Sequence, residues 1–171
     1  MTEVRRLDAE SARAALPQLA RMLAEAVENG DSVSFMSPLS EEDAVAFFES
    51  LLAEIANGRR VLLAAFDGDE VVGTVQIAHA WQPNSTHRAE VVKLLVRRDR
   101  RGQGIGKLLM QRLDEEARSD GKSLLLLDTV SESVADLLYE KLGWTRIGVI
   151  PDYALSPFGK MQAAAFFYKQ L

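Results

Sequence analysis

Hydrophobic and polar residues alternate along this chain with two different periods. In the N-terminal third, apolar residues recur every three or four positions, which predicts a helical segment from Leu7 to Gly30 and a second helix that Gly58 ends. The order Ser40-Glu41-Glu42-Asp43 is close to a capping box and predicts where the second helix begins. Pro17 lacks a backbone N–H, so it predicts a break that divides the first segment in two. Residues 32–39 between them are expected to form a loop.

The middle of the chain has strand-like sequence. Two apolar runs, Arg60 to Phe66 and Glu70 to Trp81, flank the turn Asp67-Gly68-Asp69 and predict a hairpin. After a second turn, Arg88 to Val96 predicts another strand. A glycine-containing run separates that strand from an amphipathic helix predicted over Gly104 to Ser119.

The C-terminal third alternates strand and helix signals. Ser123 to Thr129 predicts a buried strand, and Ser131 or Ser133 is expected to cap a short helix that reaches Leu142. Trp144 to Ala154 and Gln162 to Leu171 are predicted as the last strands. Helices, hairpins and a strand–helix–strand unit, in that order, indicate an α/β (α+β) protein with a mixed sheet and helices on its faces. We expect a single domain over residues 1–171.

Composition narrows the functional classes. A hydrophobic content of 47% is enough for a core, and a net charge of −5 argues against general binding of nucleic acid. The chain has no cysteine, which excludes disulfides, thiolate metal sites and an acyl-cysteine intermediate. The two histidines form no metal-ligand motif, so no metal is expected. Because no secretory signal or membrane-length apolar run is found, we expect a cytoplasmic protein without a membrane partner.

The run Arg101-Gly102-Gln103-Gly104-Ile105-Gly106-Lys107 holds the most specific chemical signal. Glycines at alternate positions expose backbone N–H groups at the start of a helix, where the helix dipole favours an anion such as phosphate. The triphosphate loop is excluded because Arg101 and Leu108 stand where it needs glycine and a hydroxyl residue. The dinucleotide fingerprint is excluded because Lys107 stands at its third glycine. The alternative interpretation is a tight turn without a ligand.

The remaining pattern, Arg101-x-x-Gly104-x-Gly106, resembles the acetyl-CoA pyrophosphate loop of the GNAT superfamily of N-acetyltransferases. A second signature follows at the expected distance, since Ala135-x-x-Leu138-Tyr139-x-x-x-Gly143-Trp144 resembles the family's A-x-x-L-Y-x-x-x-G-[FW]. The predicted element order also matches across essentially the whole chain. The resemblance implies the GNAT fold, with a mixed, mostly antiparallel central sheet of six to seven strands flanked by helices on both faces.

A narrower resemblance covers three further stretches of the chain. Arg88 to Val96, Leu126-Leu127-Asp128-Thr129 and Ile150 to Leu155 are similar to the branch that contains tabtoxin-resistance acetyltransferase. This branch implies an enzyme that detoxifies a toxin or antibiotic, although many of its members have no known substrate. One departure concerns Glu132, which stands where many family members place an asparagine that contacts the cofactor arm. Ser131 or Ser133 is expected to replace that contact.

The family implies acetyl-CoA as the cosubstrate. Its pyrophosphate would lie on the loop amides, and its pantetheine arm would bond to the backbone of a splayed strand. Four arginines in five residues, interrupted only by Asp99, precede the loop and suit a ligand with several phosphates. An ordinary buried strand would explain the apolar strand residues equally well. The predicted cofactor-binding residues are Leu94, Leu95, Val96, Arg101, Gly102, Gln103, Gly104, Ile105, Gly106 and Lys107.

The implied reaction is transfer of an acetyl group to a primary amine. An alkylamine is mostly protonated at neutral pH, so a carboxylate is needed to remove its proton. Glu90 and Asp128 are the candidates, and the sequence leaves open which is the base and which binds the ammonium. Tyr139 matches the family tyrosine that protonates the departing thiolate. Without a cysteine nucleophile, direct transfer in a ternary complex is favoured.

The acceptor is less defined by the sequence. Weak candidates to bind it are Phe35 and Met36 in the first predicted loop, together with Trp81, Asp152 and Tyr153. The leading hypothesis is an enzyme that acetylates a small-molecule amine. The alternatives are a protein N-acetyltransferase and an acetyl-CoA-binding sensor without turnover. A homodimer is common in the superfamily, and the sequence does not specify the oligomeric state.

Overall fold

The computed structural model describes residues 1–171 and contains one seven-stranded sheet in the order β1-β2-β3-β4-β5-β7-β6. Only β4 and β5 pair in parallel, and every other neighbouring pair is antiparallel. The strands are β1 (Thr2–Leu7), β2 (Arg60–Asp67), β3 (Glu70–His79), β4 (Arg88–Val96), β5 (Leu124–Val130), β6 (Thr145–Leu155) and β7 (Met161–Gln170). The predicted mixed, mostly antiparallel sheet is therefore confirmed.

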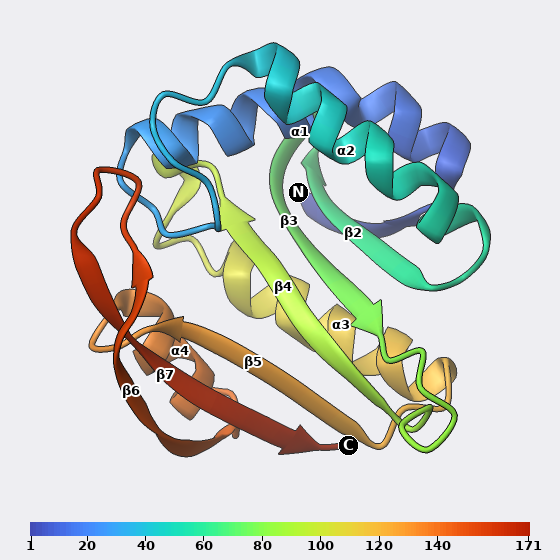
Figure 1. Cartoon of the computed structure of the whole chain (residues 1–171). Helices are drawn as coiled ribbons and strands as arrows, with labels where there is room; N and C mark the ends of the chain where they lie inside the picture. Colours follow the sequence, from blue (N-terminus) through green and yellow to red (C-terminus); the bar gives the residue numbers. More distant parts are fainter.

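Helices cover both faces of the sheet, as the sequence predicts (Figure 1). The helices are α1 (Ala9–Glu28), α2 (Glu41–Ala56), α3 (Ile105–Ser119) and α4 (Val134–Lys141), and a short 3-10 turn, Arg98–Arg100, precedes α3. One core forms between α1, α2 and the first strands, and it includes Leu23, Phe48 and Leu62. A second core on the opposite face packs Leu109 and Leu113 of α3 against the central strands. None of these helices is long and apolar enough to span a membrane.

The predicted break at Pro17 is wrong, because α1 continues through it. Pro17 is exposed, so the carbonyl group that loses its N–H partner lies on the solvent side of the helix. Leu16 and Leu19, on either side of it, are buried against the sheet and hold both halves of the helix in line. Hydrophobic packing therefore outweighs the missing hydrogen bond.

The first strand was not predicted from the sequence. Its residues pair with β2 from Thr2 opposite Asp67 to Leu7 opposite Leu62, at the edge of the sheet. Of these residues only Leu7 is buried, and three of the six are charged, so the strand has a weak apolar signal. Charged residues are common on edge strands, where they oppose association between sheets.

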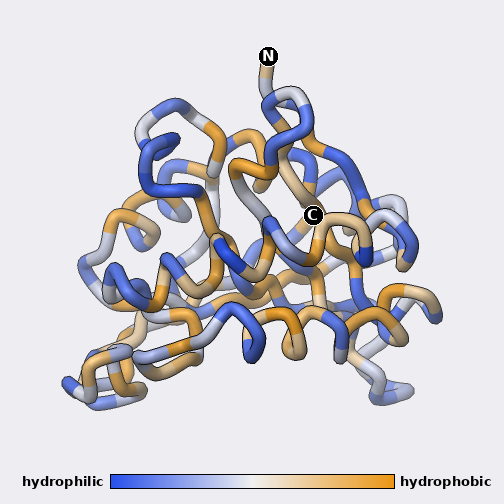
Figure 2. The backbone as a smooth tube through the Cα atoms, turned by 90° about the horizontal axis from the view of Figure 1, so that it is seen from above, coloured by the Kyte–Doolittle hydropathy of each residue, from blue (hydrophilic) through white to orange (hydrophobic).

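Most predicted boundaries agree with the structure to within two residues. Ser40 caps α2, with its hydroxyl accepting a hydrogen bond from the amide of Asp43 at 3.0 Å. Of the two serines proposed to cap α4, Ser133 does so, and its hydroxyl accepts from the amide of Asp136 at 3.1 Å. In Figure 2 hydrophilic residues gather in the peripheral loops, while hydrophobic and hydrophilic residues alternate along the helices. This alternation is the pattern from which the helices were predicted.

Candidate active site

The parallel strands β4 and β5 separate after a short paired stretch. Their register pairs Arg88 with Leu124 and ends where Glu90 pairs with Leu126. Beyond this point β4 continues beside β3 only, and β5 continues beside β7. Figure 1 shows the two strands diverging from a common start, which leaves a fork in the middle of the sheet. The edge of β4 that faces the fork therefore has backbone N–H and C=O groups without a strand partner.

A β-bulge lies on the β4 side of the fork. The pairing between β3 and β4 shifts between Thr74 and Gln76, and Lys93 adopts a left-handed conformation with φ of 57°. The extra residue bends the strand and turns the Lys93 side chain away from the regular alternation. After the bulge, Leu95 is buried on the α1/α2 face, while Leu94 and Val96 pack against the core on the α3 face. These side chains are structural, which leaves only their backbone groups open to the fork.

The glycine run forms the turn between β4 and α3. Gly102 and Gly104 have φ of 76° and 83°, a region that other residues rarely adopt, and Gly104 is the N-cap of α3. The first amide that bonds within the helix is that of Leu108, which donates to the carbonyl of Gly104 at 3.0 Å. The preceding amides, from Gly102 to Lys107, have no protein acceptors. This is the arrangement that binds anions at helix N-termini.

The third glycine of the run differs from the other two. A Cβ atom at Gly106 would lie 3.4 Å from the Leu138 side chain and 3.8 Å from that of Val96. Both are ordinary van der Waals distances, so a methyl group would fit between α3, α4 and the end of β4. By contrast, Gly102 and Gly104 have nothing within 4 Å of such an atom, so the space above the turn is open.

The four arginines before the turn bond to protein groups. Arg97 pairs with Asp99 at 2.7 Å and Arg100 with Asp67 at 2.8 Å. The carboxamide of Asn29 accepts from Arg98 at 2.7 Å. Arg101 pairs with Asp31 and donates to the carbonyl of Val96 at 3.1 Å. To contact the phosphates of a ligand, these arginines would have to give up their present protein partners. Lys107 is exposed and has no such partner.

The two candidate carboxylates lie on one face of the sheet at the fork. Glu90 is the last β4 residue paired with β5, and Asp128 lies two residues beyond its partner Leu126, so both face the α1/α2 side. Asp128 keeps solvent access, yet the surrounding protein atoms exclude enough water to raise its pKa above the ordinary value. The nearby ammonium of Lys93 acts in the opposite direction and lowers the pKa of Asp128. The structure thus brings together the residues that the sequence proposed as base and ammonium site.

Tyr139 reaches the fork from the other face. Its side chain is 5% exposed, and its ring packs against the rings of Trp144 and Phe167, each with centroids 5.9 Å away. Burial raises the pKa of its phenol, and the negative charge of Asp128 raises it further. The phenol therefore stays protonated at neutral pH, as a proton donor must.

The proposed acceptor residues lie at different places. Phe35, in the loop between α1 and α2, packs edge-on against Phe47 at 5.1 Å. Tyr153 packs edge-on at 5.0 Å against Phe166, which is the register partner of Asp128. These two aromatic side chains therefore flank the region around the fork.

The other three proposed acceptor residues are exposed. Trp81 and Glu90 both line a cavity of about 340 Å³ beside the start of β4. Met36 and Asp152 are exposed, and Asp152 has a positive φ of 50°. Of the five, Tyr153 therefore lies near Asp128 and Trp81 near Glu90, while Phe35 contacts Lys93.

The α1–α2 loop and the β6–β7 turn contact each other. The amide of Ser37 donates to the carbonyl of Pro157, in the β6–β7 turn, at 2.9 Å. Phe158 packs close to Gly30, where an added Cβ atom would lie 3.1 Å from its ring. Figure 1 shows the α1–α2 loop beside the β6–β7 hairpin, although they are more than one hundred residues apart in sequence.

The serines at the start of α4 are occupied by structural contacts. Ser133 caps the helix, and the hydroxyl of Ser131 accepts from Arg146 at 3.2 Å. Glu132 has a positive φ of 62°, and its amide donates to the buried carboxylate of Asp136 at 2.7 Å. The predicted replacement of the family asparagine by a serine would require these contacts to change.

Sequence analysis overlooked Lys93. It is the one charged residue in the apolar run from Val91 to Val96, and this isolated charge could have indicated a functional residue. Its ammonium donates to the hydroxyl of Ser34 at 3.1 Å and lies 5.7 Å from the centre of the Phe35 ring. Burial and the charge of Arg60 lower its pKa, while Asp128 and Glu90 act against this shift. A cation is therefore part of the site.

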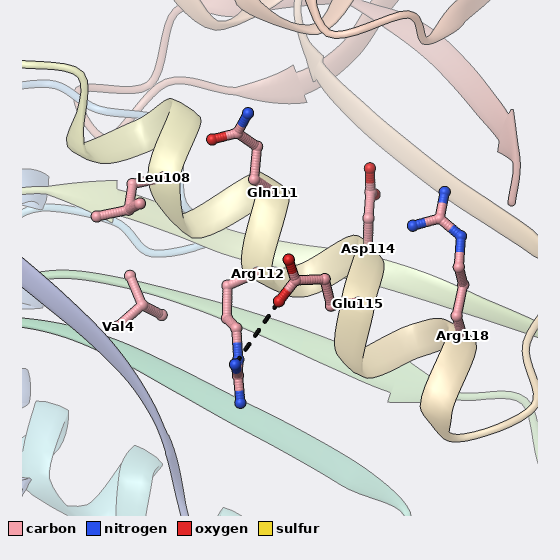
Figure 3. Close-up of a pocket in the computed structure, with 7 residues that line it drawn as sticks. All are labelled: Val4, Leu108, Gln111, Arg112, Asp114, Glu115 and Arg118. Atoms are coloured by element: carbon pink, nitrogen blue, oxygen red, sulfur yellow. Dashed lines mark ion pairs between the residues drawn. The ribbon is translucent and has the colours of Figure 1, made fainter.

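Another cavity lies away from these residues. It has a volume of about 500 Å³ and lies against the outer side of α3 (Figure 3). Its walls are mostly charged and include the ion pair between Arg112 and Glu115 at 3.6 Å. None of the proposed catalytic residues lines it, so it offers no chemistry of acetyl transfer.

Comparison with known proteins identifies the family. The model of the acetyltransferase (GNAT) family matches residues 22–144. The chain belongs to the GNAT acetyltransferase family. It is an acetyl-CoA-dependent N-acetyltransferase, and the resemblance of its motifs to this family is confirmed. No group of three or more potential metal ligands is present.

Two curated relatives cover almost the whole chain. The L-methionine sulfoximine/L-methionine sulfone acetyltransferases of Pseudomonas paraeruginosa and Pseudomonas aeruginosa are each 28% identical over 158 residues, which is 91% of this chain and 89% of theirs. Among solved structures, an N-acetyltransferase of Staphylococcus aureus Mu50 has a TM-score of 0.81 at 20% identity, covering 99% of this chain and 98% of its own. The yncA protein of Salmonella typhimurium, solved with its cofactor acetyl-CoA, has a TM-score of 0.79 at 21% identity, covering 99% and 94%.

Proposed function

We propose that this GNAT enzyme transfers the acetyl group of acetyl-CoA to a primary amine of a small molecule. The observation that carries the proposal is the fork, where Asp128 and Glu90 face one side and Tyr139 approaches from the other. These groups supply an acceptor for the amine proton and a donor for the departing thiolate. The relatives named as methionine sulfoximine and methionine sulfone acetyltransferases support a small acceptor of this kind.

The glycine turn and the open edge of β4 would hold acetyl-CoA. The free amides from Gly102 to Lys107 fit the pyrophosphate, and the backbone of Leu94, Leu95 and Val96 fits the pantetheine arm. The arm would add a strand-like partner to an edge that β5 leaves unpaired. An amide near Leu95 or Val96 would then stabilise the oxyanion of the tetrahedral intermediate.

The reaction would proceed by direct attack of the amine on the thioester. Asp128 or Glu90 takes the proton of the ammonium, and the raised pKa of Asp128 favours it as the base. The C–N bond forms, the C–S bond breaks, and Tyr139 protonates the CoA thiolate. The nitrogen then loses its second proton, which restores the phenol of Tyr139. Because the chain has no cysteine, no acyl-cysteine intermediate is available.

Binding of acetyl-CoA tests the turn without knowledge of the acceptor. We would measure it by calorimetry for the wild type and for Gly104→Glu, which adds negative charge to the proposed phosphate site. Gly121→Glu is a matched control, because Gly121 ends the same helix with a similar φ of 72° and open space. We expect Gly104→Glu to abolish binding and Gly121→Glu to retain it. Equal binding by both folded variants would contradict the proposed cradle.

The acceptor is tested by release of free thiol from acetyl-CoA. L-Methionine sulfoximine and L-methionine sulfone are the first amines to assay, followed by other amino acids and simple alkylamines. We expect turnover with at least one of them and a large loss in Asp128→Asn. If the protein binds acetyl-CoA but acetylates no amine, and Asp128→Asn leaves acetyl-CoA binding unchanged, the result favours the sensor hypothesis.

A protein acceptor is the second candidate. The contact between Ser37 and Pro157 joins the α1–α2 loop to the β6–β7 turn, which favours a small molecule over a peptide that runs through a groove. Peptide amines in the same thiol assay test this alternative. Turnover on peptides that exceeds turnover on all small amines would replace the small-molecule proposal.

The biological setting is proposed on the same basis. Acetylation would inactivate a toxic amine, and one domain over residues 1–171 would act in the cytoplasm without a nucleic-acid or membrane partner. We also propose a homodimer, because β6 is an edge strand whose residues are all exposed, among them Ile147 and Val149. Sedimentation equilibrium tests this, and a monomer at assay concentration would exclude it.

A further inference from the structure

The open face beside the fork carries charges of both signs. Around Lys93, the charged groups that act on it are Glu90, Asp128 and Arg60. Arg60 is already neutralised, since it pairs with Glu54 at 2.6 Å and donates to the side chain of Gln76 at 2.9 Å. Arg59 and Arg88 line the cavity beside Glu90 at the start of β4, so Lys93 is the cation near Asp128 whose charge could act on a ligand.

Lys93 has no counter-ion of its own. Its ammonium hydrogen-bonds to the neutral hydroxyl of Ser34 at 3.1 Å, and no carboxylate lies within 4.0 Å of it. The side chain is half-buried and lies over the rings of Phe35 and Phe47, 5.7 and 5.9 Å from their centres. A partly desolvated ammonium without an anion is costly, and a bound anion would offset this cost.

The backbone fixes where that charge lies. Lys93 occupies the bulge of β4 with φ of 57°, next to the strand edge proposed to hold the pantetheine arm. Asp128 and Glu90 are near enough to influence the pKa of Lys93, and they lie on the same side of the sheet. A single small ligand can therefore meet the carboxylates with its amine and Lys93 with an anionic group.

We propose that Lys93 binds the carboxylate of the acceptor and selects amino acids over amines without a negative charge. This proposal rests on the proposed function, because it assumes that the acceptor amine is at Asp128 and Glu90. The ammonium of the zwitterion lies toward these two residues, and its carboxylate accepts hydrogen bonds from Lys93. Lys93 is thus a specificity-determining residue of the acetyl transfer.

A purely structural role for Lys93 is the competing explanation. The bond to Ser34 and the contact with Phe35 connect β4 to the α1–α2 loop, and their loss would lower activity on every acceptor alike. Removal of the cation would also raise the pKa of Asp128, again with equal effect on all acceptors. The ratio of kcat/KM for two acceptors cancels both effects.

The matched probes are L-methionine sulfone and 3-(methylsulfonyl)propylamine, which is the same molecule without its carboxylate. We would determine kcat and KM for both with the wild type, Lys93→Met, Lys93→Arg and Lys141→Met. Methionine keeps the length of the apolar stem, arginine keeps the charge, and Lys141 is an exposed lysine on α4. Calorimetry with the same two probes measures binding independently of turnover.

We expect the wild type to prefer the amino acid. In Lys93→Met this preference should fall about 10- to 100-fold, mainly through KM, as loss of a charged hydrogen bond predicts. Lys93→Arg should retain most of the preference, and Lys141→Met all of it. An unchanged ratio in Lys93→Met, or a wild type that prefers the amine, overturns the proposal while acetyl transfer itself stands.

Failure of the proposed function has a different signature. If neither probe causes release of thiol from acetyl-CoA, the calorimetric binding of the two probes tests the anion site. Tighter binding of L-methionine sulfone than of the amine, lost in Lys93→Met, supports the site. Equal binding of the two probes, or no binding of either, overturns it.

Discussion

The ammonium of Lys93 donates a hydrogen bond to the hydroxyl of Ser34, 3.1 Å away and 59 positions earlier in the chain. This contact joins the bulge of the central strand β4 to the loop between α1 and α2. It places a cation beside Asp128 and Glu90, so that the electrostatics of the proposed base depend on a residue outside the glycine turn and the α4 signature. The first prediction follows from this coupling.

The pH dependence of kcat should identify the base. Asp128 must be unprotonated to accept a proton, and burial raises its pKa, so kcat should fall as the pH drops through this raised value. In Lys93→Met the cation that lowers the pKa of Asp128 is absent, so the acidic limb should move to higher pH. Lys93→Arg keeps the charge and should keep the limb near its wild-type position. An acidic limb that survives in Asp128→Asn would assign the base to Glu90.

Tyr139→Phe should separate catalysis from packing. Phenylalanine retains the ring contacts with Trp144 and Phe167, so the free energy of unfolding should change by less than about 1 kcal/mol. Loss of the acid should lower kcat by about 100-fold or more. Tyr139→Ala should cost about 3–5 kcal/mol of stability, because it leaves a cavity. Thiol release and urea denaturation measure the two effects, and wild-type kcat in Tyr139→Phe would exclude Tyr139 as the acid.

Gly73, which packs against α3, and Gly106, within α3, should respond differently to alanine. At Gly73 an added Cβ atom would lie 3.0 Å from the Leu109 side chain and 3.1 Å from the carbonyl of Leu95, so Gly73→Ala should destabilise by about 1–3 kcal/mol. At Gly106 the nearest atom is 3.4 Å away, and alanine is the better helix former, so Gly106→Ala should stabilise by about 0.5–1 kcal/mol. Urea denaturation measures the free energy of unfolding of both variants. An equal change in the two would contradict the closer contacts at Gly73.

Pro17→Ala should stabilise the protein. The substitution restores an N–H group in the interior of α1, at an exposed position where the alanine side chain meets no obstacle. The gain should be roughly 1–3 kcal/mol, since proline is the least favourable residue in a helix. Ala14→Pro, at another exposed position of α1, is the matched control and should destabilise. A midpoint temperature of thermal unfolding for Pro17→Ala lower than that of the wild type would show that Pro17 stabilises α1.

Local sequence patterns located most elements and the chemical groups of the site. The helix that begins after Gly104 followed from apolar spacing, and the anion-binding turn followed from the positions of its glycines. These features can be predicted from the sequence because a helix period, a cap or a left-handed turn depends on residues only a few positions apart in the chain. Asp128 was proposed from its place at the end of a predicted strand, whereas Tyr139 was proposed because it matches the tyrosine of the family signature.

Only the tertiary structure decided how these groups meet. Strand pairing added β1 despite its charges, and packing of Leu16 and Leu19 carried α1 through Pro17. The partners of the four arginines and the bulge at Lys93 depend on residues far away in the chain. Register, pairing of charges and burial are set by long-range contacts, which no local pattern of residue types encodes. The sequence by itself therefore determined most of the elements, the glycine turn and the family, and the fold determined β1, the fork and the cation beside it.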